Sequence, residues 1–166
     1  MGRLTHYVFK SLWSVDASLA ELYEVLADVR TYPEWWPEIR TVEDLGDGRF
    51  QMMARSLLPY ELRFVSQERV ENRRPNVIDA RLTGDLEGFA RWTIEPMGDG
   101  CRLTYDQEVD THKTLLNVLA PVARPGFQVN HTLMMKHGQA GLRTYMAGYG
   151  RGAQAQAEEP AGDPAT

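Results

Sequence analysis

His131 and its neighbour Asn130 are the residues of this chain best placed to do chemistry. Both fall on the apolar stripe of a proline-free stretch from Gly126 to about Met146, so they should point toward the protein interior. A histidine on such a face could act as general acid or base in an aldol-type cyclisation or a dehydration. The alternative is a core histidine bonded to a backbone carbonyl or to water, and the spacing identifies no partner that would decide between them.

Tyr105 and Gln107 form a second pair of polar residues that we expect to face inward. They share the parity of Leu103 and Val109 in an alternating stretch, and alternate residues of a strand point to one face. Their side chains could orient a ligand carbonyl, or they could place their polar ends in internal water. Four arginines have the outward parity instead, which favours cross-strand pairs with acidic residues over an anion site. These are Arg55, Arg63, Arg81 and Arg91.

Other kinds of site find no support in the sequence. The histidines His6, His112, His131 and His137 lack the spacing of metal ligands, so no metal site is expected. Cys101 is the one cysteine, and it follows a turn with no adjacent base, so neither a nucleophile nor an internal disulfide is expected. The glycine-rich turns do not open a helix, and the sequence predicts no cofactor.

Composition limits the classes of partner. The 166 residues suffice for one ordinary domain, with 43% hydrophobic residues, 25% charged residues and a formal net charge of -5. Such an acidic chain lacks the basic surface that nucleic acid or an anionic membrane would select. No stretch approaches the roughly 18 apolar residues of a membrane-spanning helix, and the N-terminus lacks the pattern of a signal peptide. We therefore expect a cytoplasmic protein with no integral membrane segment.

The first third of the chain predicts a strand, a helix and a connector. Thr5–Val15 alternates with period two, which is typical of a strand. Ser18 and Glu21 fit a capping box that opens a helix, and this helix should stop before Pro33, which disfavours the helical backbone at Tyr32. The aromatic, proline-containing stretch from Tyr32 to Ile39 predicts a short helical connector.

From Arg40 to Thr111 the pattern is one of strands separated by short turns. Alternating stretches begin at Phe50, Tyr60, Ile78, Leu86 and Leu103, and glycine- or proline-containing turns lie between them. Short turns predict antiparallel hairpins, with one apolar face that is covered and one charged face in water.

The last part of the chain should supply the cover. Residues 115–119 suggest a short apolar helix, which Pro121 and Pro125 should interrupt before a helix of about twenty residues begins at Gly126. The amphipathic pattern ends near Tyr149. The sequence therefore predicts one domain over residues 1–149 and a disordered tail over residues 150–166.

Together these elements predict an α+β fold, in which a curved antiparallel sheet wraps around a long C-terminal helix. One helix cannot fill such a sheet, so an internal apolar cavity should remain. Gly88 and Ala90 should leave space opposite larger residues, and flexible methionines suit more than one ligand shape. The expected ligand-binding residues are Trp13, Trp35, Trp36, Phe50, Met52, Phe64, Trp92, Tyr105, Asn130, His131 and Met134.

Three stretches carry a resemblance to a known family: Tyr32–Ile39, Leu86–Trp92, and the ending from Pro125 to His131 with Gly138 to Arg143. Over roughly residues 5–148 the chain resembles the START-like (SRPBCC) superfamily, particularly the bacterial polyketide cyclase/dehydrase-like proteins. The resemblance implies the helix-grip fold and a cavity for a hydrophobic ligand. It does not choose between binding and turnover, because the superfamily includes lipid carriers, quinone-binding proteins and aromatase/cyclases.

Three hypotheses follow. The first is a protein that binds or carries a hydrophobic small molecule such as a lipid, a polyketide or a quinone. The second is an aromatase/cyclase-like enzyme acting on a polyketide-type substrate, with His131 as candidate catalytic residue. A weaker third is a module whose groove grips a partner segment. The sequence leaves open whether the chain forms a homodimer.

Overall fold

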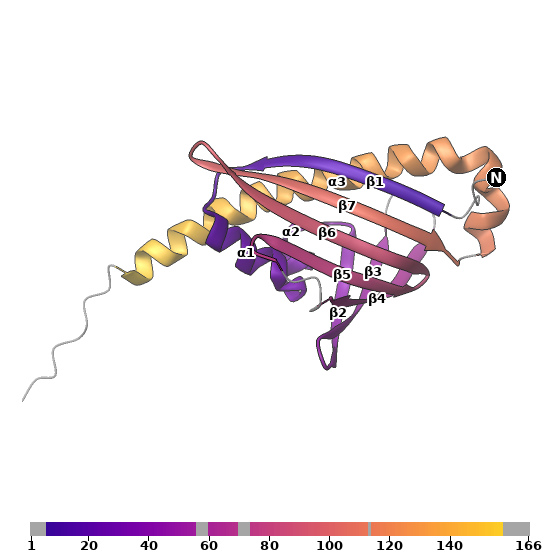
Figure 1. Ribbon diagram of the computed structural model, residues 1–166, viewed down its shortest axis with the longest axis horizontal. Coiled ribbons are helices and arrows are strands. Elements are labelled where there is room, and N and C mark those ends of the chain that lie inside the picture. The colour runs from indigo at the N-terminus through magenta and orange to yellow at the C-terminus, as the bar shows by residue number, and fades with distance from the viewer. Residues whose placement is uncertain (1–5, 56–59, 70–73, 113, 158–166) are drawn as a thin grey trace, which may run out of the picture.

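A curved antiparallel sheet and a long helix packed along it make up the architecture of this protein (Figure 1). The structure is a computed structural model that describes the backbone of residues 6–55, 60–69, 74–112 and 114–157, and the side chains of these residues except 114–124 and 151–157. The strands are β1 (His6–Val15), β2 (Ile39–Gly46), β3 (Arg49–Arg55), β4 (Glu61–Glu68), β5 (Val77–Gly84), β6 (Leu86–Met97) and β7 (Gly100–Thr111). The helical elements are α1 (Leu19–Ala27), the 3-10 turn η1 (Val29–Thr31), α2 (Tyr32–Trp35) and α3 (Thr114–Ala157).

All neighbouring strands of the sheet are antiparallel, in the order β1-β7-β6-β5-β4-β3-β2. The strands from β2 to β7 follow each other in sequence, so short hairpins connect them, and β1 then pairs with β7. The α+β helix-grip class expected from the sequence is confirmed. The strand β2 was not distinguished by its pattern, because an edge strand with mostly exposed side chains shows little alternation.

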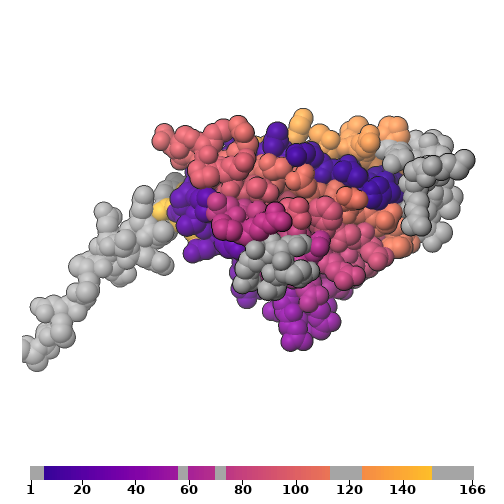
Figure 2. Space-filling model, viewed as in Figure 1, coloured from indigo at the N-terminus to yellow at the C-terminus, as the bar shows by residue number. Residues whose placement is uncertain are grey.

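The alternation of β1 separates two faces of the sheet. Tyr7, Trp13 and Val15 are buried, whereas Val8 and Leu12 on the opposite side are about two-thirds exposed. Figure 2 views this opposite, outer face, where β1, β7 and β6 form a surface without a visible opening over their coloured atoms. The buried side chains of β1 therefore face the inner side of the sheet.

Ion pairs between strands and within one strand lie on the outer face, as the parity of Arg55, Arg63 and Arg91 predicts. Arg91 donates to the buried carboxylate of Asp79 at 2.6 Å, and Arg55 and Arg63 both lie within 4 Å of the Glu61 carboxylate. These pairs fix charges on the outside of the sheet and leave the inner face apolar.

The connector differs from its prediction in one detail. The capping box between Ser18 and Glu21 is present, and α1 ends at Ala27. Tyr32 nevertheless has helical backbone angles, because Pro33 falls in the first turn of the short helix α2. A proline is tolerated there, since the N–H groups of a first helical turn have no intrahelical partner. The interpretation of the stretch as a short helical connector is otherwise correct.

The final helix is longer than predicted at both ends. Its backbone is helical from Thr114 to Ala157, so Pro121 and Pro125 do not interrupt it, although Figure 1 shows a bend in its orange N-terminal part. Prolines bend helices more readily than they end them when the surrounding residues stay helical. The helix also continues eight residues past Tyr149, into a stretch of alanine and glutamine, which are good helix formers. Residues 150–157 thus have helical backbone where the sequence predicted a disordered tail, and residues 158–166 lie outside the described residues.

Two glycines of α3 allow it to approach the connector closely. A Cβ atom on Gly141 would lie 1.7 Å from the Trp35 carbonyl oxygen, and one on Gly138 would lie 2.8 Å from the Trp36 ring. The Trp36 indole N–H donates to the Met134 carbonyl oxygen at 3.0 Å. The close contacts at Gly138 and Gly141 and the Trp36 hydrogen bond together hold the aromatic connector against α3, which covers the inner face of the sheet.

Candidate functional site

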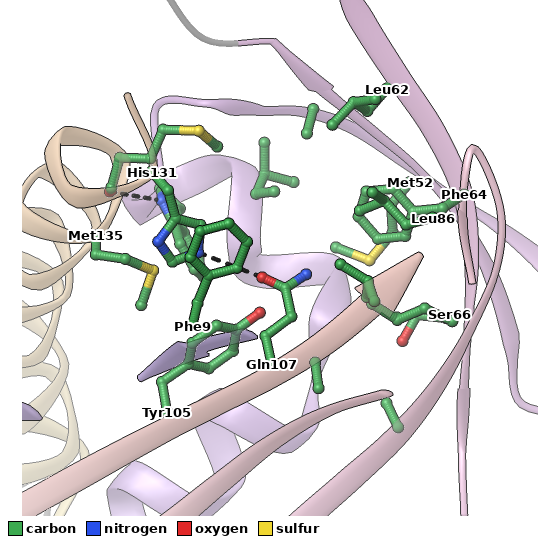
Figure 3. Close-up of a pocket in the computed structure, with 18 of the residues that line it drawn as sticks. Phe9, Met52, Leu62, Phe64, Ser66, Leu86, Tyr105, Gln107, His131 and Met135 are labelled. Carbon is green, nitrogen blue, oxygen red and sulfur yellow. Dashed lines mark hydrogen bonds between the residues drawn. The ribbon is translucent and has the colours of Figure 1, made fainter. Parts of the chain in front are cut away.

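A cavity of about 170 Å³ lies between α3 and the inner face of the sheet (Figure 3). All seven strands contribute to its wall, together with the connector and α3. The edge strand β2 does so only through its first residue, Ile39. The lining is aromatic and aliphatic with a few neutral polar groups: Tyr7, Phe9, Val29, Tyr32, Trp36, Ile39, Met52, Ala54, Tyr60, Leu62, Phe64, Ser66, Ile78, Ala80, Leu82, Leu86, Ala90, Trp92, Tyr105, Gln107, Val109, Thr111, Phe127, Asn130, His131, Met134 and Met135.

The structure brings together at this cavity eight of the eleven residues named from the sequence. They are Trp36, Met52, Phe64, Trp92, Tyr105, Asn130, His131 and Met134. They come from the connector, four strands and the last helix, so their convergence depends on the curvature of the sheet and the direction of α3. Whether they bind a ligand stays a prediction.

The other three residues named from the sequence do not line the cavity. Trp13 is buried behind its wall, with its ring centroid 5.7 Å from that of Trp36 and 4.8 Å from that of Trp92. Trp35 is buried, its ring stacks on that of Trp36 with 5.5 Å between centroids, and it borders a shallow surface hollow with Gly141 and Tyr145. Phe50 lies partly buried on β3, two residues beyond the lining residue Met52.

Several lining residues were missed by the sequence reasoning. Phe9 and Tyr7 share the inward parity of Trp13 on β1, so the alternation contained the signal that would have found them. Met135 lies beside Met134 and is the more deeply buried of the two. The helical period alone does not separate two adjacent methionines at the edge of a stripe.

The expected role of Gly88 is wrong. This residue does not line the cavity, and a Cβ atom there would lie 2.0 Å from the carbonyl oxygen of Glu108 on β7. The glycine therefore serves the close approach of two neighbouring strands. Ala90, two residues further on β6, does line the cavity as expected.

His131 is held by two contacts inside the cavity. Its imidazole stacks on the Phe9 ring, with 3.7 Å between centroids and 9° between planes, and its Nε2 lies 3.3 Å from Oε1 of Gln107 (Figure 3). With an amide oxygen as neighbour, Nε2 carries the hydrogen and Nδ1 is the free acceptor. Burial lowers the pKa of His131 to about 4, so the ring is neutral at neutral pH.

The remaining polar groups of the wall are hydroxyls and amides. Burial raises the pKa of Tyr60 to about 12 and raises the pKa of Tyr105 further, so both phenols are un-ionised. The Tyr32 hydroxyl accepts from the Trp92 indole N–H at 3.2 Å and donates to the Leu26 carbonyl at 2.8 Å, so its hydrogen bonds are used within the protein.

A pair of acid–base side chains, His137 on α3 and Glu38 just before β2, lies away from the cavity wall. His137 Nδ1 is 2.6 Å from the Glu38 carboxylate, and neither residue lines the cavity. Among the residues that the structure describes, no cluster of histidine, cysteine and carboxylate side chains could hold a metal ion. The described wall thus offers hydrogen bonds and apolar contact but no carboxylate.

A family model described as polyketide cyclase / dehydrase and lipid transport matches residues 15–134. The chain belongs to this family. The matched range includes the connector, all strands from β2 to β7 and the part of α3 that carries Asn130, His131 and Met134. This membership also confirms the START-like, polyketide cyclase-like resemblance expected from the sequence.

Solved structures in the same superfamily share the fold. A START superfamily protein from Mycobacterium smegmatis is 18% identical, with a TM-score of 0.69 over 86% of this chain and 98% of its own. The Zhui aromatase/cyclase from a Streptomyces species is 16% identical, with a TM-score of 0.67 over 86% of this chain and 94% of its own. At such identities the likeness shows the fold alone. No curated protein sequence matches significantly.

Over the described part of the chain, no helix combines the length and the apolar character needed to cross a bilayer.

Proposed function

We propose that this member of the polyketide cyclase / dehydrase and lipid transport family binds a hydrophobic small molecule in the cavity between α3 and the sheet. The observation that carries the proposal is the composition of the wall, in which aromatic and aliphatic side chains surround a few neutral polar groups. Cavities of this kind bind ligands by removing apolar surface from water, at about 25 cal/mol per Å², while a few polar groups set the orientation.

The size of the cavity bears on the class of ligand. Its 170 Å³ is close to the roughly 150 Å³ of an engineered apolar cavity that admits a benzene-sized molecule. A single ring fits the cavity as it stands. A larger lipid or polyketide requires the wall to yield, and the unbranched side chains of Met52, Met134 and Met135 are its most adaptable parts.

Turnover of a polyketide-type substrate is the second candidate. It is favoured by the family description, by the aromatase/cyclase among the structures of like fold, and by His131 with its free Nδ1 inside the cavity. A neutral imidazole could accept a proton from a carbon next to a carbonyl. The described wall holds no carboxylate to stabilise the resulting imidazolium, which weakens this candidate relative to binding.

Native mass spectrometry of the purified protein, compared with its mass under denaturing conditions, tests the binding proposal first. We expect a retained small molecule, or uptake of a neutral aromatic compound added in solution, with quenching of fluorescence from the two lining tryptophans Trp36 and Trp92. Failure to retain or take up any apolar compound would contradict a binding function.

The enzyme candidate needs a separate test. Turnover of a polyketide-type substrate that survives in His131→Ala would remove the proposed acid–base role. Loss of turnover with ligand affinity retained would support it, because binding and chemistry would then be separated.

The expectations about cellular location, partners and cofactors come from the sequence and stay proposals. We propose a cytoplasmic location, no nucleic-acid partner and no cofactor, in keeping with the net charge of -5 and with the sequence motifs. The association state is open, and a homodimer would show directly in the same native mass spectra.

A further inference from the structure

We propose that the cavity selects an uncharged, ring-containing molecule with a carbonyl or hydroxyl oxygen, and that Tyr105 and Gln107 hold this oxygen. The inference rests on the proposed binding function and concerns which ligands the same cavity accepts. It also names two specificity-determining residues on one strand, β7.

The first observation is the absence of charge from the described wall. None of the described lining side chains is an aspartate, glutamate, lysine or arginine, and the one histidine is neutral. A carboxylate or ammonium group in such a cavity would lose its hydration and gain no opposite charge. Charged residues on the sheet are paired on its outer face instead, as Arg91 is with Asp79.

The second observation is a pair of unused hydrogen-bonding groups. Tyr105 is 8% exposed and Gln107 is 9% exposed, and both line the cavity. The Gln107 amide oxygen faces His131, whereas its amide nitrogen and the Tyr105 hydroxyl have no hydrogen bond to another described residue. Both groups border the cavity, so a solvent molecule or a ligand there can serve them.

The third observation is their common direction. Residues 105 and 107 are two apart on β7, so their side chains leave the same face of the strand. Figure 3 shows the Tyr105 hydroxyl and the Gln107 amide reaching into the space below the Phe9 ring. Both groups can donate a hydrogen bond, and a ketone or hydroxyl oxygen of a ligand can accept one.

The neighbouring aromatic rings indicate what should carry this oxygen. The Trp92 ring centroid lies 4.6 Å from that of Tyr105, and the Trp36 centroid lies 6.2 Å from it, so the polar pair is bordered by indole rings. A ligand ring can pack edge-to-face or offset against such rings. The groups that would bind the ligand oxygen and the rings that would pack on the ligand thus lie next to each other in the cavity.

The test compares three single-ring ligands of nearly equal shape: acetophenone, benzoate and ethylbenzene. Affinities are measured by isothermal titration calorimetry on the full chain at pH 7.5, where the acid is ionised and the ketone is not. We expect the ketone to bind at least about 100-fold more tightly than the carboxylate, since burying an unpaired charge is costly. We expect it to bind about 3- to 10-fold more tightly than the hydrocarbon, the effect of an ordinary neutral hydrogen bond.

Two variants test whether Tyr105 and Gln107 donate hydrogen bonds to the ligand oxygen. Tyr105→Phe and Gln107→Leu should each reduce the ratio of ketone affinity to hydrocarbon affinity, because one hydrogen bond to the ligand oxygen is removed. Tyr23→Phe deletes a hydroxyl from α1, outside the cavity wall, and serves as matched control. Thermal unfolding of each variant checks that it folds.

The outcomes separate this inference from the proposed function. Equal affinity for ketone and carboxylate would leave binding intact and overturn the selection for uncharged ligands. Loss of the ketone preference in Ser66→Ala, with Tyr105→Phe and Gln107→Leu unaffected, would overturn the assignment to β7, since Ser66 is a lining hydroxyl on β4. Binding of none of the three compounds would contradict the proposed function and the inference together.

Discussion

The imidazole of His131 lies flat on the phenyl ring of Phe9, with 3.7 Å between ring centroids and 9° between ring planes. One residue comes from the first strand and the other from the last helix, so the stack joins the two ends of the described fold. It also encloses the histidine, and this burial disfavours the charged imidazolium. The stack thereby explains why a residue with the chemistry of a pH switch is neutral over the physiological range.

The first prediction concerns stability against pH. Above pH 6.5 His131 is neutral in both the folded and the unfolded chain and adds no pH dependence. Between pH 6.5 and about 4 the unfolded chain binds a proton that the folded chain does not, so the free energy of unfolding should fall as the pH falls. The total loss should approach about 3 kcal/mol, at about 1.4 kcal/mol per pH unit.

Urea unfolding at several pH values checks this prediction, with His131→Phe as the matched variant. Other titrating groups are common to both proteins, so the difference between their curves isolates His131. A difference that stays constant between pH 7 and pH 4 would show that the folded imidazole titrates normally.

The second prediction concerns the contact between α3 and the connector. Gly141→Ala should destabilise the fold by about 3 kcal/mol, because a new Cβ would meet the Trp35 carbonyl oxygen at 1.7 Å and backbone would have to move. Gly148→Ala on the same helix is the control, since nothing lies within 4 Å of a Cβ there. That change should stabilise by about 0.5–1 kcal/mol through helix propensity. Thermal denaturation distinguishes the two, and equal effects would refute close packing at Gly141.

The third prediction concerns the volume of the cavity. Met134→Trp should fill part of the 170 Å³ and reduce affinity for acetophenone at least tenfold, since ligand and indole would compete for one space. Thr132→Trp places the same ring on the exposed side of α3 and should leave affinity unchanged. Calorimetric titration gives both values. Unaltered binding by Met134→Trp would place the ligand elsewhere.

The fourth prediction concerns the Tyr32 hydroxyl. Tyr32→Phe should cost about 1–3 kcal/mol, because it leaves the Trp92 indole N–H and the Leu26 carbonyl without their buried partner. Tyr149→Phe removes an exposed hydroxyl that donates to Glu24, and its effect should stay within about 0.5 kcal/mol. Denaturant unfolding at pH 7 measures both. A Tyr32→Phe protein as stable as the parent would mean that water replaces the lost hydroxyl.

The periodicities of the sequence determined most of the secondary structure. Alternation in β1 and in β3 to β7 predicted which side chains face inward, because the two-residue period of a strand is a local property of the backbone. The capping box of Ser18 and Glu21 predicted the start of α1 for the same reason. Eight residues that line the cavity could be named on these grounds, together with the aromatic character of the connector.

Only the tertiary structure decided which of the inward residues border empty space. Trp13 and Trp36 have the same chemical character, yet one is packed behind the wall and the other forms it, because the curvature of the sheet and the depth of α3 set the boundary. The partners of His131 are likewise separated from it by many residues, on β1 and β7. A local pattern predicts the direction of a side chain. Which residues that side chain contacts depends on where distant parts of the chain lie in the tertiary structure.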